Sequence, residues 1–297
     1  MIAGVCYIRD ACDMLPFLCG HYLRAGFDHL RFVDDGSTDG TFAFLTEFAK
    51  RSNRVSVQRV ESNFDDQPDR VTEAANAMIA KGYRIIVPFD SDELWNVTAA
   101  QLREAFAGKG DIALRGRWQN FVQKRRRLSG SSSGLLHMRY RAPEAGGDRE
   151  SITNYRLPFV CYFEKKVAFA TSAPVQIARG QHSLIKGPSL QDGNEFEIFH
   201  LPLRCRDEIV KRAINYEPRR APRRTCPDES WQSSFHGEVV STGRLEAVWA
   251  ANSANDEGCL DVYGNPLTLI PDTRLRHVLA RAWFYMARCW PTLVLRR

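Results

Sequence analysis

Short apolar runs alternate with longer segments that carry apolar residues at helical spacing along the first 107 residues. The runs are typical of buried strands, and the spaced segments are typical of helices. The expected strands cover residues 2–8, 29–33, 54–60 and 84–89, and the expected helices cover 12–25, a segment through 44–48, 71–81 and a segment from Thr98. Such alternation indicates a mostly parallel sheet with helices on its faces. We therefore expect an α/β fold.

The second half of the chain is less regular. Strands are expected at residues 111–121, 159–163, 167–171 and 196–200, and a helix at 206–216. Gln123–Gly134 is basic and rich in Ser and Gly, which fits either a linker or a flexible lid over a phosphate-bearing substrate. After residue 216 the chain is rich in Pro and Arg. We predict a main domain over residues 1–216 and a smaller, partly helical C-terminal extension over 217–297.

Three carboxylates, Asp90, Asp92 and Glu93, follow the strand expected at 84–89. If that strand runs on through Asp92, the side chains of Asp90 and Asp92 point to the same side, because strand residues alternate. Two converging carboxylates repel each other unless a cation or a proton lies between them. A divalent metal ion between the two carboxylates would remove this repulsion, and a substrate phosphate would complete the coordination of the ion. The alternative is that these acids cap the helix expected from Thr98.

Acids also follow two other expected strands. Asp34 and Asp35 begin the polar loop D-D-G-S-T-D-G-T, in which Asp39 or Thr38 can cap the next helix, and Asp10 follows the first strand. In parallel α/β sheets, ligands bind at the carboxyl ends of the strands. The convergence of these acids at one edge of the sheet predicts an active site there.

Composition restricts the function classes. The chain has 297 residues, 44% hydrophobic and 26% charged, which is ordinary for a globular protein that buries a full core. We expect no signal peptide and no membrane-spanning helix. The eight cysteines form no CxxC pair, which favours reduced thiols in a cytoplasmic protein. The net charge is +6, and basic residues cluster at 124–127, 219–224 and 274–297. Such clusters suit phosphates, nucleic acid or an anionic membrane. No motif that reads DNA or stacks bases accompanies them, so we expect no nucleic-acid partner.

Two motifs together resemble a known family. V-D-D-G-S-T-D-G-T is similar to the nucleotide-binding loop of family 2-type glycosyltransferases with the GT-A fold, and F-D-S-D-E-L-W resembles the D-x-D motif of their D-x-D-E subgroup. The resemblance covers roughly residues 1 to 216. It implies a metal-dependent transfer of a sugar from a nucleotide-diphosphate sugar, with a UDP-sugar expected, to an acceptor hydroxyl with inversion.

The resemblance also implies roles for single residues. The donor would be held by Asp10, Asp34, Asp35, Arg70, Asn76 and Asp90, and the metal by Asp92 and His200. In the subgroup, Asn-Glu usually follows the first strand, whereas this chain has Arg9 and Asp10, and the shorter side chain of Asp10 puts that contact in question. A His ligand favours Mn²⁺ over Mg²⁺.

His182, in G-Q-H, matches a recurrent G-x-H and would line the pocket. Glu195 and Asp192 are candidates for the catalytic base, and Glu93 is assigned a structural or positioning role. For His200, the alternative is a histidine whose hydrogen bonds are satisfied within the core.

Two other function classes stay open. A nucleotidyltransferase also places acids at strand ends, but it usually needs a Gly-rich phosphate loop, which I-R-D-A-C-D-M lacks. A non-catalytic carbohydrate- or nucleic-acid-binding protein is the third class.

The basic, apolar segment from Leu275 to Trp290 predicts a helix that either lies on a membrane surface or packs on the main domain. Membrane contact would favour a lipid-linked acceptor in surface polysaccharide or lipopolysaccharide synthesis and a peripheral position at the inner face of the membrane.

Overall fold

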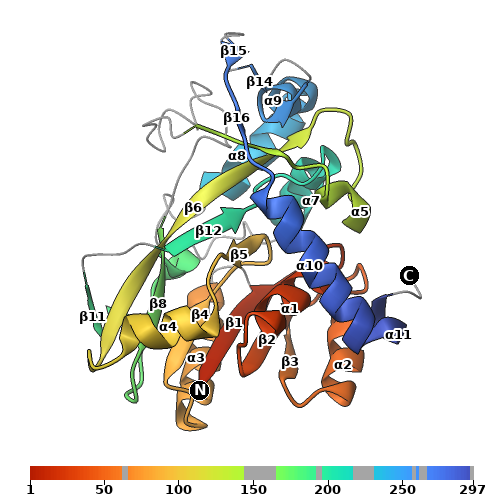
Figure 1. Ribbon diagram of the computed structural model, residues 1–297. Helices are drawn as coiled ribbons and strands as arrows, with labels where there is room; N and C mark the ends of the chain where they lie inside the picture. The colour runs from red at the N-terminus through yellow and green to blue at the C-terminus, as the bar shows by residue number, and fades with distance from the viewer. Residues whose placement is uncertain are drawn as a thin grey trace. The chain divides into compact units, whose positions relative to one another are not determined.

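The computed structural model describes residues 1–61, 66–143, 165–191, 196–216, 231–255, 259–260 and 266–294 (Figure 1). Contacts group the chain into two compact units. The first comprises residues 1–118, 164–199 and 278–297, and the second comprises 119–163 and 200–277. This grouping does not test the functional boundary placed at residue 216, which stays a prediction.

Four parallel strands form the centre of the first unit. They are β1 (Ile2–Ile8), β2 (His29–Asp35), β3 (Val55–Val60) and β4 (Ile85–Pro88), in the order β3-β2-β1-β4. Beyond β4, strand β8 (Lys165–Ala170) pairs antiparallel with β4 and with residues 112–117 of β6 (Ile112–Lys124). The predicted α/β fold with a mostly parallel sheet is confirmed.

Four helices connect these strands, where the sequence predicts them. They are α1 (Leu15–Arg24), α2 (Thr41–Arg51), α3 (Gln67–Ala80) and α4 (Ala99–Phe106). Helix α3 begins one turn earlier than expected because Pro68 lies in its first turn, where its missing N–H costs nothing. Helix α4 is capped by Thr98, in a capping box with Gln101. The acids of residues 90–93 therefore do not cap this helix, and that alternative is wrong.

Both faces of β1 are covered, and all seven of its residues are buried, as expected for a central parallel strand. Ala3, Val5 and Tyr7 belong to the core cluster that also contains Val71 and Ala75 of α3. On the other face, a Cβ added at Gly4 would lie 2.8 Å from the ring of Phe89. The sheet is thus held on both sides, so that the loops at its carboxyl edge are fixed in place.

The chain after β4 differs from the prediction. Strand β4 ends at Pro88, and residues 90–93 form a turn in which the Glu93 N–H donates to the Asp90 carbonyl at 3.1 Å. The next strand, β5, begins only at Glu93 (Glu93–Trp95). The strand does not run through Asp92, so the alternation argument for Asp90 and Asp92 is wrong.

Further along, Lys165 and Lys166, expected between two strands, lie within β8. The strand expected at 159–163 lies outside the described residues. The unit also contains short elements, namely β9 (Gln176–Ile177), η3 (Arg179–Gln181), β10 (Leu184–Lys186), β11 (Ser189–Leu190) and most of β12 (Phe196–His200).

In the second unit, the end of β6 pairs with β7 (Tyr140–Arg141), and β7 pairs with β16 (Ile270–Pro271). Its other elements are α5 (Ser132–Leu135), α7 (Asp207–Tyr216), α8 (Trp231–Ser241), α9 (Leu245–Ala251), β13 (Ser253–Ala254), β14 (Cys259–Leu260) and β15 (Pro266–Leu267). The stretch Gln123–Gly134 is not one continuous loop, because β6 extends to Lys124 and α5 begins at Ser132.

Helix α10 (Arg274–Cys289) and α11 (Pro291–Val294) close the chain. From Val278 on, both belong to the first unit. Leu279, Ala282 and Met286 of α10 are fully buried, and a Cβ added at Gly20 of α1 would lie 2.2 Å from the Ala282 carbonyl oxygen. The apolar face of α10 therefore packs on the first unit, which is the second of the two alternatives. No helix in the described part of the chain is long and apolar enough to cross a bilayer.

Candidate active site at the carboxyl edge of the sheet

Strand order marks one edge of the first unit as a ligand site. The chain runs from β1 outward to β2 and β3 and then returns to place β4 on the other side of β1. Such a reversal opens a crevice at the carboxyl ends of the two strands that flank it. Asp10 follows β1, Asp34 and Asp35 end β2, and Asp90 follows β4. These four acids thus lie at the same edge of the sheet.

Asp34 is fully buried at the end of β2. The Ser37 N–H donates to its Oδ2 at 3.2 Å, and Nη1 of the half-exposed Arg59 lies 3.9 Å from the same oxygen. Among the described residues, no group donates a hydrogen bond to Asp34 Oδ1. A buried carboxylate oxygen is costly to leave unsatisfied, so this atom is suited to accept a hydrogen bond from a ligand.

The loop after β1 is locked to the loop after β2. Asp10 has a φ of 47°, its Oδ1 accepts the Thr38 N–H at 2.7 Å, and its own N–H donates to Ser37 Oγ at 3.0 Å. Arg9 Nη1 lies 3.5 Å from Oδ2 of the buried Asp35. The Thr41 N–H donates to Asp39 Oδ1, so Asp39, rather than Thr38, satisfies the start of α2. The short side chain of Asp10 therefore fits the contact between these two loops.

The end of β4 carries a buried charge network. Lys166 Nζ, on β8, lies 2.5 Å from Asp90 Oδ2 and 3.1 Å from Glu93 Oε1. Trp118 Nε1 donates to Glu93 Oε1 at 2.7 Å, and the Asp90 N–H donates to Glu93 Oε2 at 2.9 Å. The Trp118 ring centroid lies 5.5 Å from Nζ, within the range of a cation–π contact. Glu93 and Lys166 are both fully buried.

Burial and charge act in opposite directions in this network. Burial, followed by the nearby carboxylates of Asp90 and Asp92, raises the pKa of Glu93 to about 8, while Lys166 lowers it. Burial alone would lower the pKa of Lys166, but the carboxylates of Asp90 and Glu93 raise it above its usual value. Lys166 therefore keeps its charge, and the cluster has a cation that is part of the protein.

The G-Q-H segment lies in the same cluster. Gln181 is buried, has a φ of 60°, and its Nε2 donates to Asp90 Oδ1 at 3.0 Å. His182 Nδ1 donates to the Lys165 carbonyl oxygen at 2.8 Å, and the His182 ring meets Trp118 edge-on at 6.0 Å between centroids. Gly180 has a φ of 67°, and a Cβ there would lie 2.5 Å from His182 Nε2. The structure thus brings His182 and Asp90 into one network, although its neighbour Gln181 makes the direct contact.

The donor set fits a metal ion in part. Among the described residues, no three His, Cys, Asp or Glu side chains are arranged to hold an ion by themselves. Each carboxylate oxygen of Asp90 and Glu93 already accepts a hydrogen bond, and the donors are Lys166, Gln181, Trp118 and the Asp90 N–H. Asp92, which is 9% exposed, lies in the turn between them. An ion in this turn would therefore need ligands beyond Asp90 and Glu93.

Arg70 and Asn76, both on α3, lie apart from this network. Arg70 pairs with Glu73 at 2.9 Å. The Asn76 amide donates to the Val175 carbonyl at 3.0 Å and accepts the Val175 N–H at 2.9 Å. Six residues of helix place Asn76 about 9 Å beyond Arg70 along the axis. The Asn76 amide joins two segments of the protein, and its predicted contact with the donor stays a prediction.

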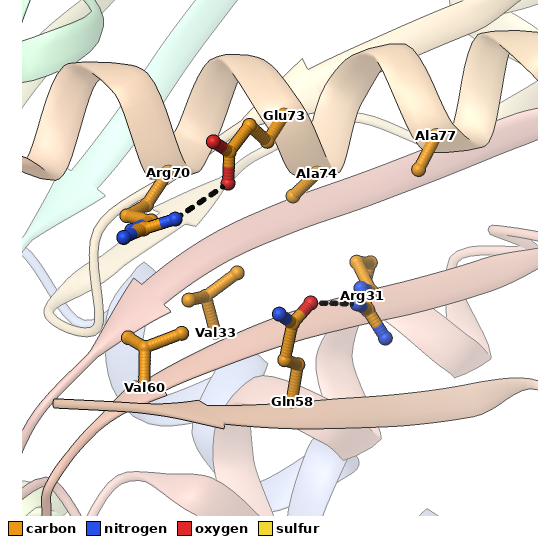
Figure 2. Close-up of a pocket in the computed structure, with 8 residues that line it drawn as sticks. All are labelled: Arg31, Val33, Gln58, Val60, Arg70, Glu73, Ala74 and Ala77. Atoms are coloured by element: carbon orange, nitrogen blue, oxygen red, sulfur yellow. Dashed lines mark hydrogen bonds and ion pairs between the residues drawn. The ribbon is translucent and has the colours of Figure 1, made fainter.

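A groove of about 230 Å³ lies between α3 and strands β2 and β3 (Figure 2). Of the predicted site residues that the structure describes, only Arg70 lines it. Its two arginines are already bonded, Arg31 to Gln58 and Arg70 to Glu73. The groove and the acidic network are therefore different places, and we assign no ligand to the groove.

His200 belongs to the second unit and is buried. Its Nδ1 lies 2.7 Å from Asn120 Oδ1, in the same unit. With the amide oxygen facing the ring, Nδ1 carries the proton and Nε2 the lone pair, which is the tautomer of a metal-binding histidine. The same bond also suits a histidine satisfied within the core, so both interpretations stay open. Asp192 and Glu195 lie outside the described residues.

Sequence reasoning missed Lys166, Gln181 and Trp118 as members of the site. Trp118 was placed on a strand and Gln181 in the G-Q-H segment, but neither was connected to Asp90. The one signal in the sequence for Lys166 was a pair of lysines next to an apolar run. If such a lysine lies within a buried strand, it needs a charged partner.

Comparisons with known proteins give distant likenesses. The chain matches no family model and no curated protein. Among solved structures, S. aureus TarS in complex with UDP is 12% identical with a TM-score of 0.38, and the match covers 98% of this chain and 73% of that chain. The mannosyltransferase PcManGT from Pyrobaculum calidifontis, in complex with GDP-Man and Mn²⁺, is 12% identical with a TM-score of 0.34, covering 98% and 87%. HddC from Yersinia pseudotuberculosis is 7% identical with a TM-score of 0.38, covering 68% and 95%. Likeness at this level assigns no activity.

Proposed function

We propose that this protein is a glycosyltransferase that moves a sugar from a nucleotide-diphosphate sugar to an acceptor hydroxyl. The observation that carries the proposal is the placement of Asp10, Asp34, Asp35 and Asp90 at the carboxyl ends of three adjacent parallel strands. The two motifs that resemble family 2-type glycosyltransferases lie at two of these strand ends. The arrangement of the sheet agrees with the GT-A type that this resemblance implies.

The unsatisfied Oδ1 of Asp34 supports a nucleoside at the end of β2. This oxygen is buried and needs a hydrogen-bond donor, and a ribose hydroxyl or an imide N–H of uracil supplies one. The Arg9 and Arg59 guanidinium groups lie beside Asp35 and Asp34, and they add positive charge near the place of the phosphates. A UDP-sugar is therefore the donor that we propose.

Asp90 is positioned for the sugar side of the donor. It is 28% exposed in its side chain, while Lys166 and Gln181 hold its two oxygens from the protein side. Asp92, with the donor phosphates and His200 as a further ligand, would hold Mn²⁺ in preference to Mg²⁺. A bound ion supplies charge stabilisation for the leaving diphosphate. His182 lines the same pocket in this proposal.

For the acceptor side, a carboxylate would deprotonate the acceptor hydroxyl as it attacks the anomeric carbon, with inversion. Glu195 and Asp192 are the candidates for this base. The acceptor proposed is a carbohydrate or a lipid-linked precursor of a surface polysaccharide. Because the apolar face of α10 is buried, membrane contact would have to use its exposed face, around Arg281, Phe284 and Arg288.

A thermal-shift screen of UDP, GDP, CDP and their sugars, with and without Mn²⁺, tests the proposal. We expect a stabilising shift from one nucleoside diphosphate, and slow hydrolysis of its sugar nucleotide with Mn²⁺. Asp92→Ala should abolish this turnover while the melting temperature stays close to wild type. The absence of a thermal shift with any nucleotide would contradict the proposed function. Full turnover by Asp92→Ala would contradict the role of Asp92 as a metal ligand. Transfer of the nucleoside monophosphate group from a nucleoside triphosphate to a sugar phosphate, with release of pyrophosphate, would instead support the nucleotidyltransferase class.

A further inference from the structure

The acidic cluster after β4 already contains a cation. Lys166 is fully buried, and its ammonium group lies between the carboxylates of Asp90 and Glu93, at 2.5 and 3.1 Å. Divalent ions bind carboxylate oxygens at roughly 2.0–2.6 Å. An ion shared by Asp90 Oδ2 and Glu93 Oε1 would therefore overlap the Lys166 ammonium group.

The surrounding groups fix this arrangement. Trp118 Nε1 donates to the oxygen of Glu93 that faces Lys166, and the Asp90 N–H donates to the other one. Gln181 donates to the second oxygen of Asp90 and is held in a left-handed backbone conformation while it does so. A non-glycine residue rarely adopts this conformation unless its surroundings impose it. These contacts orient both carboxylates toward one position, and the lysine fills that position.

We propose that Lys166 is the resident cation of this cluster, in the place that a divalent ion would otherwise take between Asp90 and Glu93. Asp90 is then a fixed hydrogen-bond acceptor rather than a metal ligand. The only metal that the turn can take is one bound through Asp92 together with ligands from outside the pair. In this proposal Lys166 is a positioning residue, because it contacts Asp90 and Glu93 and acts on a donor through Asp90.

Two substitutions at this position separate charge from volume. Lys166→Ala removes the ammonium group and opens space for a hydrated ion between Asp90 and Glu93. Lys166→Met removes the same charge but keeps a chain of similar length, so the space stays filled. The probe is Mn²⁺ alone, without any nucleotide, followed by the electron paramagnetic resonance signal of the free ion.

We expect the Ala variant to bind one Mn²⁺ at least ten-fold more tightly than the wild-type protein, and the Met variant to show no gain. Equal affinities of the Ala and Met variants would overturn the proposal. So would a wild-type protein that binds Mn²⁺ as tightly as the Ala variant does.

The Ala variant leaves two carboxylates without their partner and can fail to fold in the absence of metal. In that case folding is the readout, measured by circular dichroism and thermal unfolding with and without Mn²⁺. Rescue of the Ala variant but not of the Met variant by Mn²⁺ supports the proposal, and absence of rescue overturns it. These measurements use no sugar nucleotide, so their failure is distinct from a failure of the proposed transferase activity.

Discussion

The acids at the end of β2 and those at the end of β4 are balanced by different kinds of cation. Asp34 and Asp35 face Arg59 and Arg9, whose side chains are 41% and 29% exposed, at 3.9 and 3.5 Å. Asp90 and Glu93 share Lys166, which is buried, at 2.5 and 3.1 Å. Exposed arginines can turn from a carboxylate to a phosphate at little cost, whereas a buried lysine cannot leave its partners. The β2 end is therefore suited to bind and release a charged ligand, and the β4 end is fixed before any ligand arrives.

The largest effect is expected from removing the buried cation. Lys166→Met should lower the free energy of unfolding by about 3–5 kcal/mol, because it leaves the buried Glu93 and the partly buried Asp90 without their partner. Arg59→Met is the matched change at the β2 end and should cost no more than about 1 kcal/mol, because the ion pair with Asp34 is long and the Arg59 side chain is 41% exposed. Urea unfolding followed by circular dichroism measures both. Similar losses in the two variants would remove the distinction between the two strand ends.

Titration of Glu93 should appear in the pH dependence of stability. Burial, with the Asp90 and Asp92 carboxylates, raises the pKa of Glu93 to about 8, whereas the unfolded chain has the usual value near 4.5. Between these values the folded state holds more protons, so stability falls as the pH rises, by up to about 1.4 kcal/mol per pH unit.

Glu93→Gln removes this titration, and the variant should show a flatter stability curve than the wild-type protein between pH 5 and pH 8. Chemical unfolding at four pH values across this range measures the difference. Parallel curves would mean that Lys166 keeps Glu93 ionised throughout.

A substitution at the end of β2 should lower the affinity for the nucleotide rather than the free energy of unfolding. In Asp34→Asn, the amide oxygen can keep the bond from the Ser37 N–H, and the amide N–H₂ then replaces the unsatisfied Oδ1 acceptor. Loss of one hydrogen bond to a charged group costs about 1.5–3 kcal/mol, which is a 10- to 100-fold weaker affinity. Calorimetry with the nucleoside diphosphate found in the thermal-shift screen measures it. Glu47→Gln, on exposed α2, is the control and should bind as wild type.

Much of the fold follows from local sequence pattern, but part of the site does not. The alternation of strands and helices up to Phe106 gives β1 to β4 and their order of appearance, and the strand-end rule places Asp10, Asp34 and Asp90. Repulsion between Asp90 and Asp92 predicted a cation or a proton between them, with a divalent ion as the simplest choice, whereas the structure places a lysine between Asp90 and Glu93. The identity of that cation depends on β8, which inserts antiparallel between β4 and β6 and brings Lys166 to Asp90 across 76 residues. A lysine pair beside an apolar run reads as a solvated strand end, and no local pattern reports the long-range pairing that buries it.

The smallest loss of stability is expected from removing the cap of α4, the helix that follows the acids after β4. Thr98 caps α4 by accepting the Gln101 N–H, and Gln101 Oε1 accepts the Thr98 N–H in return. Thr98→Ala should therefore lower the free energy of unfolding by about 1 kcal/mol, as other capping residues do. Because the cap is formed without Asp90, Asp92 or Glu93, the variant should bind the nucleoside diphosphate and Mn²⁺ as the wild-type protein does. Thermal unfolding and calorimetry on the same preparation measure both quantities. A loss of ligand binding in Thr98→Ala would mean that α4 and the acidic turn act as one element, and that the rigidity of the β4 end depends on the helix as well as on Lys166.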